Sequence, residues 1–170
     1  EGLHTLYTDT LRSLIDFSLY VDPADDVKKE WKLKRDMEKR GYTRHEVIEE
    51  IQKRQEDYDR YIAPQKEYAD ALIQIAFSRY GRDLGWQKNI YETTLSQIPI
   101  SDELPGADLA LNLPALMTLV PGQFSLHYSR RVYGGKTMAS LTFDGEFDCH
   151  FILGLRDLFS GEAGVSPCQI

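Results

Sequence analysis

The 170-residue sequence has only two cysteines, no apolar run long enough to span a bilayer, and an excess of acidic over basic residues. Cys149 and Cys168 lie far from any second Cys or His pair with zinc-ligand spacing, and two cysteines cannot build a disulfide scaffold. These absences predict a chain that is soluble and lies in a reducing compartment, with the cytoplasm as the default.

The shortage of positive charge also limits the partners that we expect. The formal net charge is −7, whereas general nucleic-acid binding needs a broad basic surface to neutralise phosphates. A local basic segment would instead suit a small anionic ligand. With 42% hydrophobic residues the chain can bury a core, and its length fits one domain or one half of a larger one.

Familiar catalytic motifs are missing as well. Gly134-Gly135-Lys136-Thr137 matches the end of a Walker A phosphate loop, but Arg130 occupies the position of its first glycine, so the spacing predicts a hairpin turn. The serines have no nucleophile-elbow context, which argues against a hydrolase. The histidines have no metal-ligand spacing. They are His4, His45, His127 and His150.

The first part of the chain has the pattern of an α/β unit. Apolar and polar residues alternate over residues 15–22, which predicts a strand, and Asp22-Pro23-Ala24-Asp25 then predicts a turn into a helix that ends at Arg40. Thr43 and Glu46 form a capping box for a second helix that continues toward Ile62, where Pro64 interrupts it. A branched apolar run predicts a strand at 71–77.

The second part has an antiparallel pattern. Residues 78–113 predict loops with one or two short strands. Strands are expected at 115–120, 125–133 and 138–143, with turns at Pro121-Gly122 and Gly134-Gly135, and a final helix follows Asp148 with apolar residues over 151–159. We therefore predict an α/β fold with residues 1–77 as an α/β core and 78–170 as a β-rich portion with a late helix.

The helix that ends at Arg40 has two distinct sides. The side that we expect to pack carries Val27, Trp31, Leu33 and Met37. The opposite side carries Lys32, Arg35, Asp36 and Arg40. Gly41 suits the position just past the helix end, after a cation in the last turn. Spacing alone favours a solvated basic face, with an anion-binding face as the alternative.

Several segments occur in an order that resembles a known family. They are Glu1-Gly2-Leu3-His4, the strand that ends at Asp22, Lys32-x-x-Arg35-Asp36-Met37-x-x-Arg40-Gly41, Asp57-Tyr58-Asp59-x-Tyr61-Ile62-x-Pro64-Gln65-Lys66-x-x-Ala69-Asp70, and Leu141-Thr142-Phe143-Asp144-Gly145-Glu146-Phe147-Asp148. Together they resemble the phosphoribulokinase/uridine kinase family, in the phosphoribulokinase form of plants and cyanobacteria. The Pro-x-Lys-x-x-Ala-Asp segment alone does not separate the two kinases.

The resemblance implies a P-loop kinase-type αβα fold and an enzyme that uses ATP and Mg²⁺ to convert ribulose 5-phosphate to ribulose 1,5-bisphosphate. It also implies a homodimer and, in a photosynthetic organism, a role in carbon fixation, a Calvin-cycle regulatory complex and a plastid location if eukaryotic.

The family's functional residues carry over to this sequence by position. The resemblance assigns catalysis to Glu1, Arg35 and Asp36, with Glu1 also near magnesium. It assigns substrate binding to Lys32, Arg35, Arg40 and His4, and a nucleotide lid to Arg54 and Lys66. On this basis we interpret the polar side of the basic helix as a ligand-binding face.

Two departures from the family pattern are visible. The family's phosphate loop and catalytic-base aspartate precede its Glu-Gly-Leu-His segment, so these residues resemble the second half of the enzyme, and we expect no kinase activity from them alone. The plant cysteine pair is absent, since Gly122 and Tyr128 occupy its positions. A uridine kinase-like part and a noncatalytic interaction or dimerisation module remain the alternatives.

Overall fold

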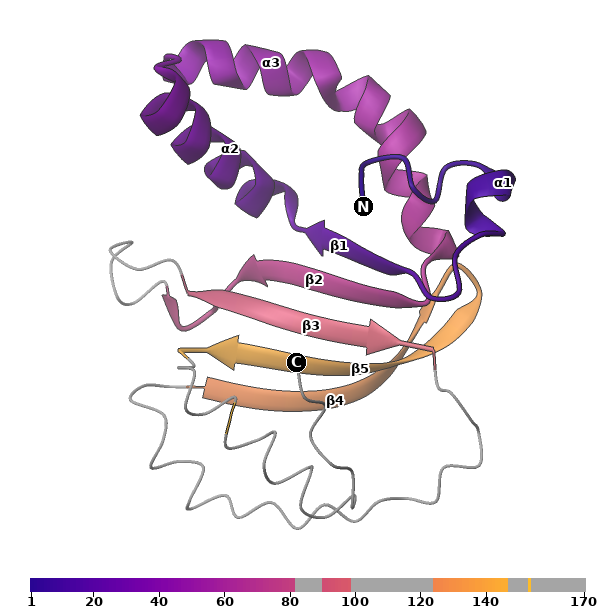
Figure 1. Cartoon of the computed structure of the whole chain (residues 1–170). Coiled ribbons are helices and arrows are strands. Elements are labelled where there is room, and N and C mark those ends of the chain that lie inside the picture. The colour runs from indigo at the N-terminus through magenta and orange to yellow at the C-terminus, as the bar shows by residue number, and fades with distance from the viewer. Residues whose placement is uncertain (82–89, 99–123, 147–152, 154–170) are drawn as a thin grey trace.

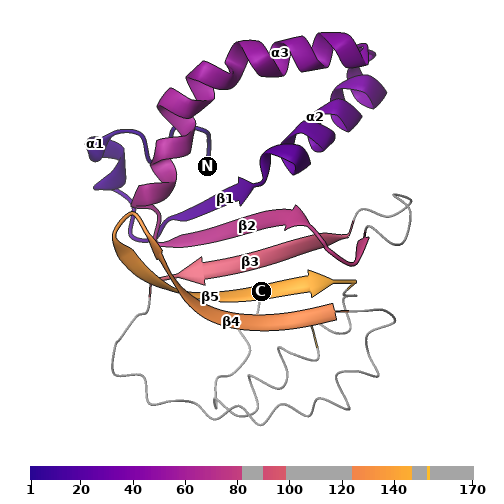
Figure 2. The same cartoon turned by 180° about the vertical axis from the view of Figure 1, so that it is seen from behind.

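The computed structural model describes residues 1–81, 90–98, 124–146 and 153, and over these residues the fold is mixed α/β. Five strands form one sheet, and a helical hairpin arches beyond one edge of it (Figures 1 and 2). The elements in chain order are α1 (Asp9–Arg12), β1 (Leu19–Pro23), α2 (Asp25–Arg40), α3 (Arg44–Asp57), the π-helix η1 (Tyr58–Ile62), the 3₁₀-helix η2 (Ala63–Tyr68), β2 (Ala71–Phe77), β3 (Tyr91–Gln97), β4 (Phe124–Tyr133) and β5 (Lys136–Gly145).

The sheet has the order β1-β2-β3-β5-β4 and contains one parallel pair. β1 and β2 are parallel, and the helical segment from α2 to η2 connects them. The remaining pairs are antiparallel, as the sequence predicts for the second part. β4 and β5 meet in a two-residue turn at Gly134 and Gly135, whose φ values of 52° and 77° favour glycine. The predicted hairpin turn is therefore confirmed.

The first strand begins later than the alternating pattern predicts. Residues 13–18 form turns and bends, and β1 starts at Leu19. The reason is a polar anchor, because the Asp70 carboxylate accepts from the Ser18 backbone N–H at 2.8 Å and from its hydroxyl at 2.6 Å. This anchor fixes where the chain can enter the sheet beside β2. Helix α1, capped by Thr8, is an element that the sequence analysis did not predict.

Both predicted helices are confirmed, with one correction to how α2 packs. The Thr43–Glu46 capping box opens α3 as expected, and Gly41 ends α2 at φ 73°. The buried residues of α2 are Val27 and Asp36, whereas Trp31 and Met37 on the expected packing side are 39% and 44% exposed. The expected packing face is wrong in this respect because α2 rises away from the sheet, where little of it can be covered (Figure 1).

The segment after α3 continues to Ile62, as predicted, but as a π-turn followed by 3₁₀ geometry. Pro64 lies at the start of η2, where a missing N–H is tolerated. This segment also contributes to the core, which consists of Leu6, Ala69, Leu72 and Met138 with Tyr20, Ile98 and Tyr133 packed against it. The core therefore joins the N-terminal segment, η2, β2 and β5.

Some expectations fall outside the described residues. The strand expected at 115–120 is one of them, and of the final helix predicted over 151–159 only Leu153 is described. No helix in the described part of the chain combines the length and the apolar character that crossing a membrane requires. The proposed division into 1–77 and 78–170 stays a prediction.

Candidate functional site

Half of the described residues that line a groove between α2 and α3 are positively charged. Its volume is about 300 Å³, and its cations are Lys28, Lys29 and Lys32 from α2 and Arg54 from α3. The only carboxylate that lines it is Asp25. Cations outnumber acids among these lining residues, which makes the groove suitable for an anionic ligand.

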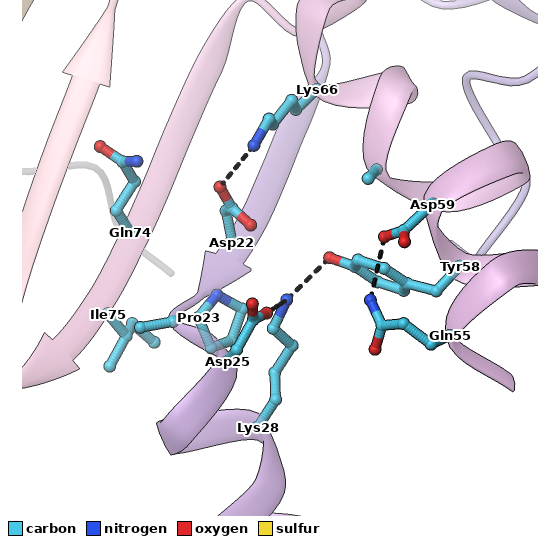
Figure 3. A pocket seen from close by; sticks show the side chains of 12 residues that line it. Asp22, Pro23, Asp25, Lys28, Gln55, Tyr58, Asp59, Lys66, Gln74 and Ile75 are labelled. Carbon is cyan, nitrogen blue, oxygen red and sulfur yellow. Dashed lines mark hydrogen bonds and ion pairs between the residues drawn. The ribbon is translucent and has the colours of Figure 1, made fainter. Parts of the chain in front are cut away.

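Below the groove lies a second cavity of about 480 Å³ at the carboxyl end of β1 (Figure 3). Asp22 and Gln74 reach it from the two parallel strands, and Tyr58 and Asp59 reach it from η1. Lys66 of η2 lies with its Nζ 3.4 Å from the Asp22 carboxylate. Ligands of α/β proteins bind preferentially outside the carboxyl ends of parallel strands, so the place as well as the lining indicates a binding site.

The groove and the cavity share part of their walls. Both are lined by Asp25, Lys28, Gln55 and Tyr58. The Lys28 Nζ donates to the Tyr58 hydroxyl at 2.9 Å and lies 2.8 Å from the Asp25 carboxylate (Figure 3). Burial lowers the pKa of Lys28, but the bonds to Asp25 and Tyr58 outweigh it, and the net shift is upward. Lys28 therefore stays charged at the junction of the two spaces.

The upper end of the groove is held by an ion-pair relay. Glu50 of α3 accepts from Arg54 at 2.8 Å and lies 4.0 Å from the Lys32 Nζ. This relay connects two of the residues that the family resemblance assigns to ligand binding. It also joins α2 to α3 across the groove.

A second cluster lies at the tip of the hairpin, where α2 ends. The side chain of Asp36 is buried, and it accepts from the Arg35 Nε at 2.8 Å and from a second Arg35 nitrogen at 3.2 Å. Arg40 lies 3.3 Å from the same carboxylate. The hydrogen bonds from Arg35 lower the pKa of Asp36; burial opposes them, and attraction to Arg35, Arg40 and Lys32 adds to the lowering. Asp36 is thus a fixed anion that orients two guanidinium groups.

The N-terminal segment forms a separate recess. Glu1, His4 and the apolar side chains of Leu11, Leu14 and Ile15 line a space of about 510 Å³. The buried amide of Gln65 fixes this segment, because its oxygen accepts from the Leu6 N–H at 2.9 Å and its nitrogen donates to the Leu3 carbonyl at 2.8 Å. The same nitrogen donates to Tyr61 of η1 at 2.7 Å.

The structure therefore divides the site residues expected from the sequence into three places. Lys32, Arg54 and Lys66 lie along the groove and cavity; Arg35, Asp36 and Arg40 form the tip cluster; Glu1 and His4 share the recess. Sequence reasoning did not single out Lys28, Gln55 and Tyr58. Lys28 lies one helical turn before Lys32, so the i, i+4 spacing of the two lysines is the signal that could have found it.

Metal binding is a separate question from anion binding. Within residues 1–81, 90–98 and 124–146, no group of three or more His, Cys, Asp or Glu side chains has the arrangement of a metal site. Mg²⁺ bound with a nucleotide commonly takes one or two protein carboxylates and completes its coordination with phosphate oxygens and water. A single carboxylate such as Glu1 fits that donor set, and its role at a metal stays a prediction.

A mixed sheet with a basic helical hairpin rising from the end of a parallel strand is typical of an α/β protein that binds phosphate esters. Residues 1–79 match the model of the Phosphoribulokinase / Uridine kinase family. This part of the chain is therefore similar to that family of kinases.

Individual phosphoribulokinases and uridine kinases are similar to parts of this chain. Phosphoribulokinase of Synechocystis sp. is 45% identical over 83 residues, which are 49% of this chain and 25% of that protein. Chloroplastic phosphoribulokinase of Triticum aestivum is 45% identical over 75 residues, 44% of this chain and 19% of the relative. Uridine kinase of Borrelia turicatae is 34% identical over 101 residues, 54% of this chain and 49% of the relative. The matching segment thus spans a quarter or less of each of these two curated phosphoribulokinases.

A solved structure extends the likeness to the fold of the whole chain. Phosphoribulokinase from Rhodobacter spheroides superposes with a TM-score of 0.54 at 20% identity, covering 97% of this chain and 57% of that one. The predicted α/β kinase-like fold is therefore confirmed.

Proposed function

We propose that this chain supplies the substrate-binding part of an ATP-dependent sugar-phosphate kinase that phosphorylates ribulose 5-phosphate to ribulose 1,5-bisphosphate. The higher identity to phosphoribulokinases than to the uridine kinase supports the choice of substrate. The fold likeness to a phosphoribulokinase, which extends over nearly the whole chain, is consistent with it.

The tip cluster is the observation that carries the proposal. Asp36 holds Arg35 through two hydrogen bonds and Arg40 through an ion pair, so both guanidinium groups are oriented before a ligand arrives. Arginine forms paired hydrogen bonds with phosphate, and phosphoryl transfer depends mainly on cations placed around the oxygens that carry charge. In our proposal Arg35 and Arg40 bind the sugar phosphate with Lys32, and Asp36 serves the reaction by orienting the two guanidinium groups.

The remaining expected residues take the nucleotide side of the reaction. Glu1 would contribute one carboxylate to Mg²⁺, His4 would contact substrate beside it, and Arg54 and Lys66 would contact the phosphates of ATP. When bound, Mg²⁺ neutralises charge on the transferred phosphoryl group. The 170 residues contain no complete Walker A pattern. We therefore expect no turnover from this chain alone with ATP, Mg²⁺ and ribulose 5-phosphate.

Isothermal titration of the chain with ribulose 5-phosphate tests the proposal. We expect binding that weakens by about tenfold to a hundredfold in Arg35→Ala, since charge-assisted hydrogen bonds contribute roughly 1.5 to 3 kcal/mol. Lys34→Ala removes an exposed cation from the same helix and should leave the affinity unchanged. Equal affinity in the wild type and Arg35→Ala would instead favour the noncatalytic interaction or dimerisation module.

A uridine kinase-like part is the second candidate within the family. The 34% and 40% identities to the two Borrelia uridine kinases favour keeping it. Tighter binding of uridine than of ribulose 5-phosphate in the same titration would replace the first proposal by this one.

The wider biological setting belongs to the same proposal. A phosphoribulokinase would act in the Calvin cycle, in the cytoplasm or the plastid stroma, as a homodimer and within a regulatory complex. Light scattering of the purified chain tests the dimer directly, because a monomer at micromolar concentration would contradict it.

A further inference from the structure

Lys28 is the charged side chain at the junction of the groove and the cavity, and neither the family motifs nor the sequence patterns assign it a role. It lines both spaces together with Tyr58. A ligand that extends from one space into the other would have to pass its ammonium group. Its position is therefore more central than that of Arg54 or Lys66, which each line only one of the two.

The Lys28 side chain is held in place without being fully used. Its Nζ donates to the Tyr58 hydroxyl at 2.9 Å, lies 2.8 Å from Asp25 and is 4.4 Å from the centre of the Tyr58 ring. An ammonium group has three N–H donors, and among the described residues only these two oxygens accept from it. Asp25 is 89% exposed, so the pair is weak and a phosphate dianion can replace it.

Tyr58 has a second polar neighbour in Tyr20 of β1. It is the first residue of the π-turn η1, a geometry that is often found at functional sites. The Tyr20 hydroxyl donates to the Ile62 carbonyl at 3.2 Å, and burial together with the neighbouring Tyr58 raises the pKa of Tyr20.

The two spaces differ in chemistry on either side of Lys28. The groove above carries Lys29, Lys32 and Arg54, and although Glu50 lies beside the last two, the excess of cations attracts negative charge. The cavity below is lined by groups that accept or donate hydrogen bonds to hydroxyls: Asp22, Gln55, Tyr58, Asp59 and Gln74. A molecule with a phosphate at one end and hydroxyl groups at the other matches both halves.

We propose that Lys28, positioned by Tyr58, is a further phosphate-binding residue beside Lys32, with the phosphate of a sugar phosphate between Lys28 and Lys32 and its hydroxyl groups in the cavity below. The inference rests on the proposed function in taking the ligand to be a phosphorylated sugar. It adds Lys28 to the proposed binding residues. It also gives the ligand a direction, with the sugar toward β1.

Titration calorimetry with ribulose 5-phosphate and with inorganic phosphate tests the assignment on the whole chain. Lys28→Met keeps the aliphatic stem and should weaken both ligands by about tenfold or more, whereas Lys28→Arg should keep most of the affinity. Tyr58→Phe retains the ring and should cause a smaller, roughly threefold loss. Lys34→Met is the matched control on an exposed part of α2 and should bind like the wild type.

Each result separates this inference from the proposed function. Unchanged ribulose 5-phosphate binding in Lys28→Met, or an equal loss in Lys34→Met, overturns the site while the proposed function stands. If Lys28→Met loses inorganic phosphate binding, the phosphate subsite is supported. If the wild type also binds ribulose 5-phosphate no more tightly than inorganic phosphate, the placement of the sugar in the cavity is overturned. Absence of binding of either ligand to the wild type overturns both.

Discussion

The two ends of the α2–α3 hairpin handle positive charge in different ways. At the tip, defined by Arg35, Asp36 and Arg40, two guanidinium groups share one buried carboxylate. At the base, defined by Asp25, Lys28 and Tyr58 around the cavity, an ammonium group has an exposed acid and a phenol as partners. The tip is a network whose geometry is set within the helix, while the base depends on contacts between separate elements.

At the tip the two guanidinium groups are held in a fixed orientation, whereas at the base the ammonium group of Lys28 is available to a ligand. At the tip the carboxylate is buried while both arginines are about half exposed, so replacing an arginine would leave a buried carboxylate with fewer partners, and the tip should respond strongly to that substitution. The exposed pair at the base has little energy of its own, which leaves Lys28 free to exchange Asp25 for a ligand. The tip should therefore control both folding and binding, and the base should control binding alone.

The largest effect is expected for Asp36→Asn. A neutral amide cannot hold Arg35 and Arg40 as the carboxylate does, so we expect affinity for ribulose 5-phosphate to fall by roughly thirtyfold or more, and the Tm to decrease because charge-assisted hydrogen bonds are lost. Calorimetry and a thermal melt followed by circular dichroism measure the two effects. Glu38→Gln, an exposed acid on the same helix, is the control for the lost charge. Wild-type binding in Asp36→Asn would remove the tip from the site.

The tip should also be visible in the pH dependence of stability. The hydrogen bonds from Arg35 lower the pKa of Asp36 below that of an unfolded aspartate, which is about 3.9. Its contribution is therefore complete above the unfolded pKa and is lost as the pH falls through the lower folded pKa. Urea unfolding at pH 5 and pH 3 should show a smaller loss in Asp36→Asn than in the wild type. Some loss should remain, because the hydrogen bond from Ser18 also lowers the pKa of Asp70.

Much of the local structure follows from short-range patterns. The capping box at Thr43, the glycine that ends α2 and the Gly134-Gly135 turn each satisfy a local backbone requirement, and all three occur where the sequence predicts them. The strand at 71–77 follows from its apolar, branched composition. The basic side of α2 was also visible from helical periodicity.

What the sequence could not predict depends on contacts between distant residues. The start of β1 is set by Asp70, which is 52 residues from Ser18, and Gln65 reaches back 59 residues to Leu6. Asp36 was expected on a ligand face and is instead enclosed by the arginines around it. Charge periodicity identifies which residues share a helix side, but it does not show which of them pair with one another.

An intermediate effect is expected at Gln65, which joins η1 to the N-terminal segment. Gln65→Leu removes the amide that serves Leu3, Leu6 and Tyr61, and leaving such groups unpaired should cost about 2 kcal/mol of unfolding free energy. Urea denaturation measures this loss, and faster amide exchange at Leu6 would locate it. Gln65→Glu keeps the acceptor for Leu6 and should protect that amide better than the leucine variant. Identical exchange in both variants would contradict the anchoring role.

The smallest effect is expected at the capping box of α3. Thr43→Ala removes the hydroxyl that accepts from the Glu46 N–H, and loss of an N-cap typically costs about 1 kcal/mol. Because Thr43 follows the tip cluster but contacts none of its arginines, stability should fall slightly while ribulose 5-phosphate affinity stays within about twofold. Thr43→Ser, which keeps a capping hydroxyl, should restore the stability. If Thr43→Ala instead weakened binding as much as Asp36→Asn, the orientation of the arginines would depend on the helix turn, and the self-contained tip would be the wrong description.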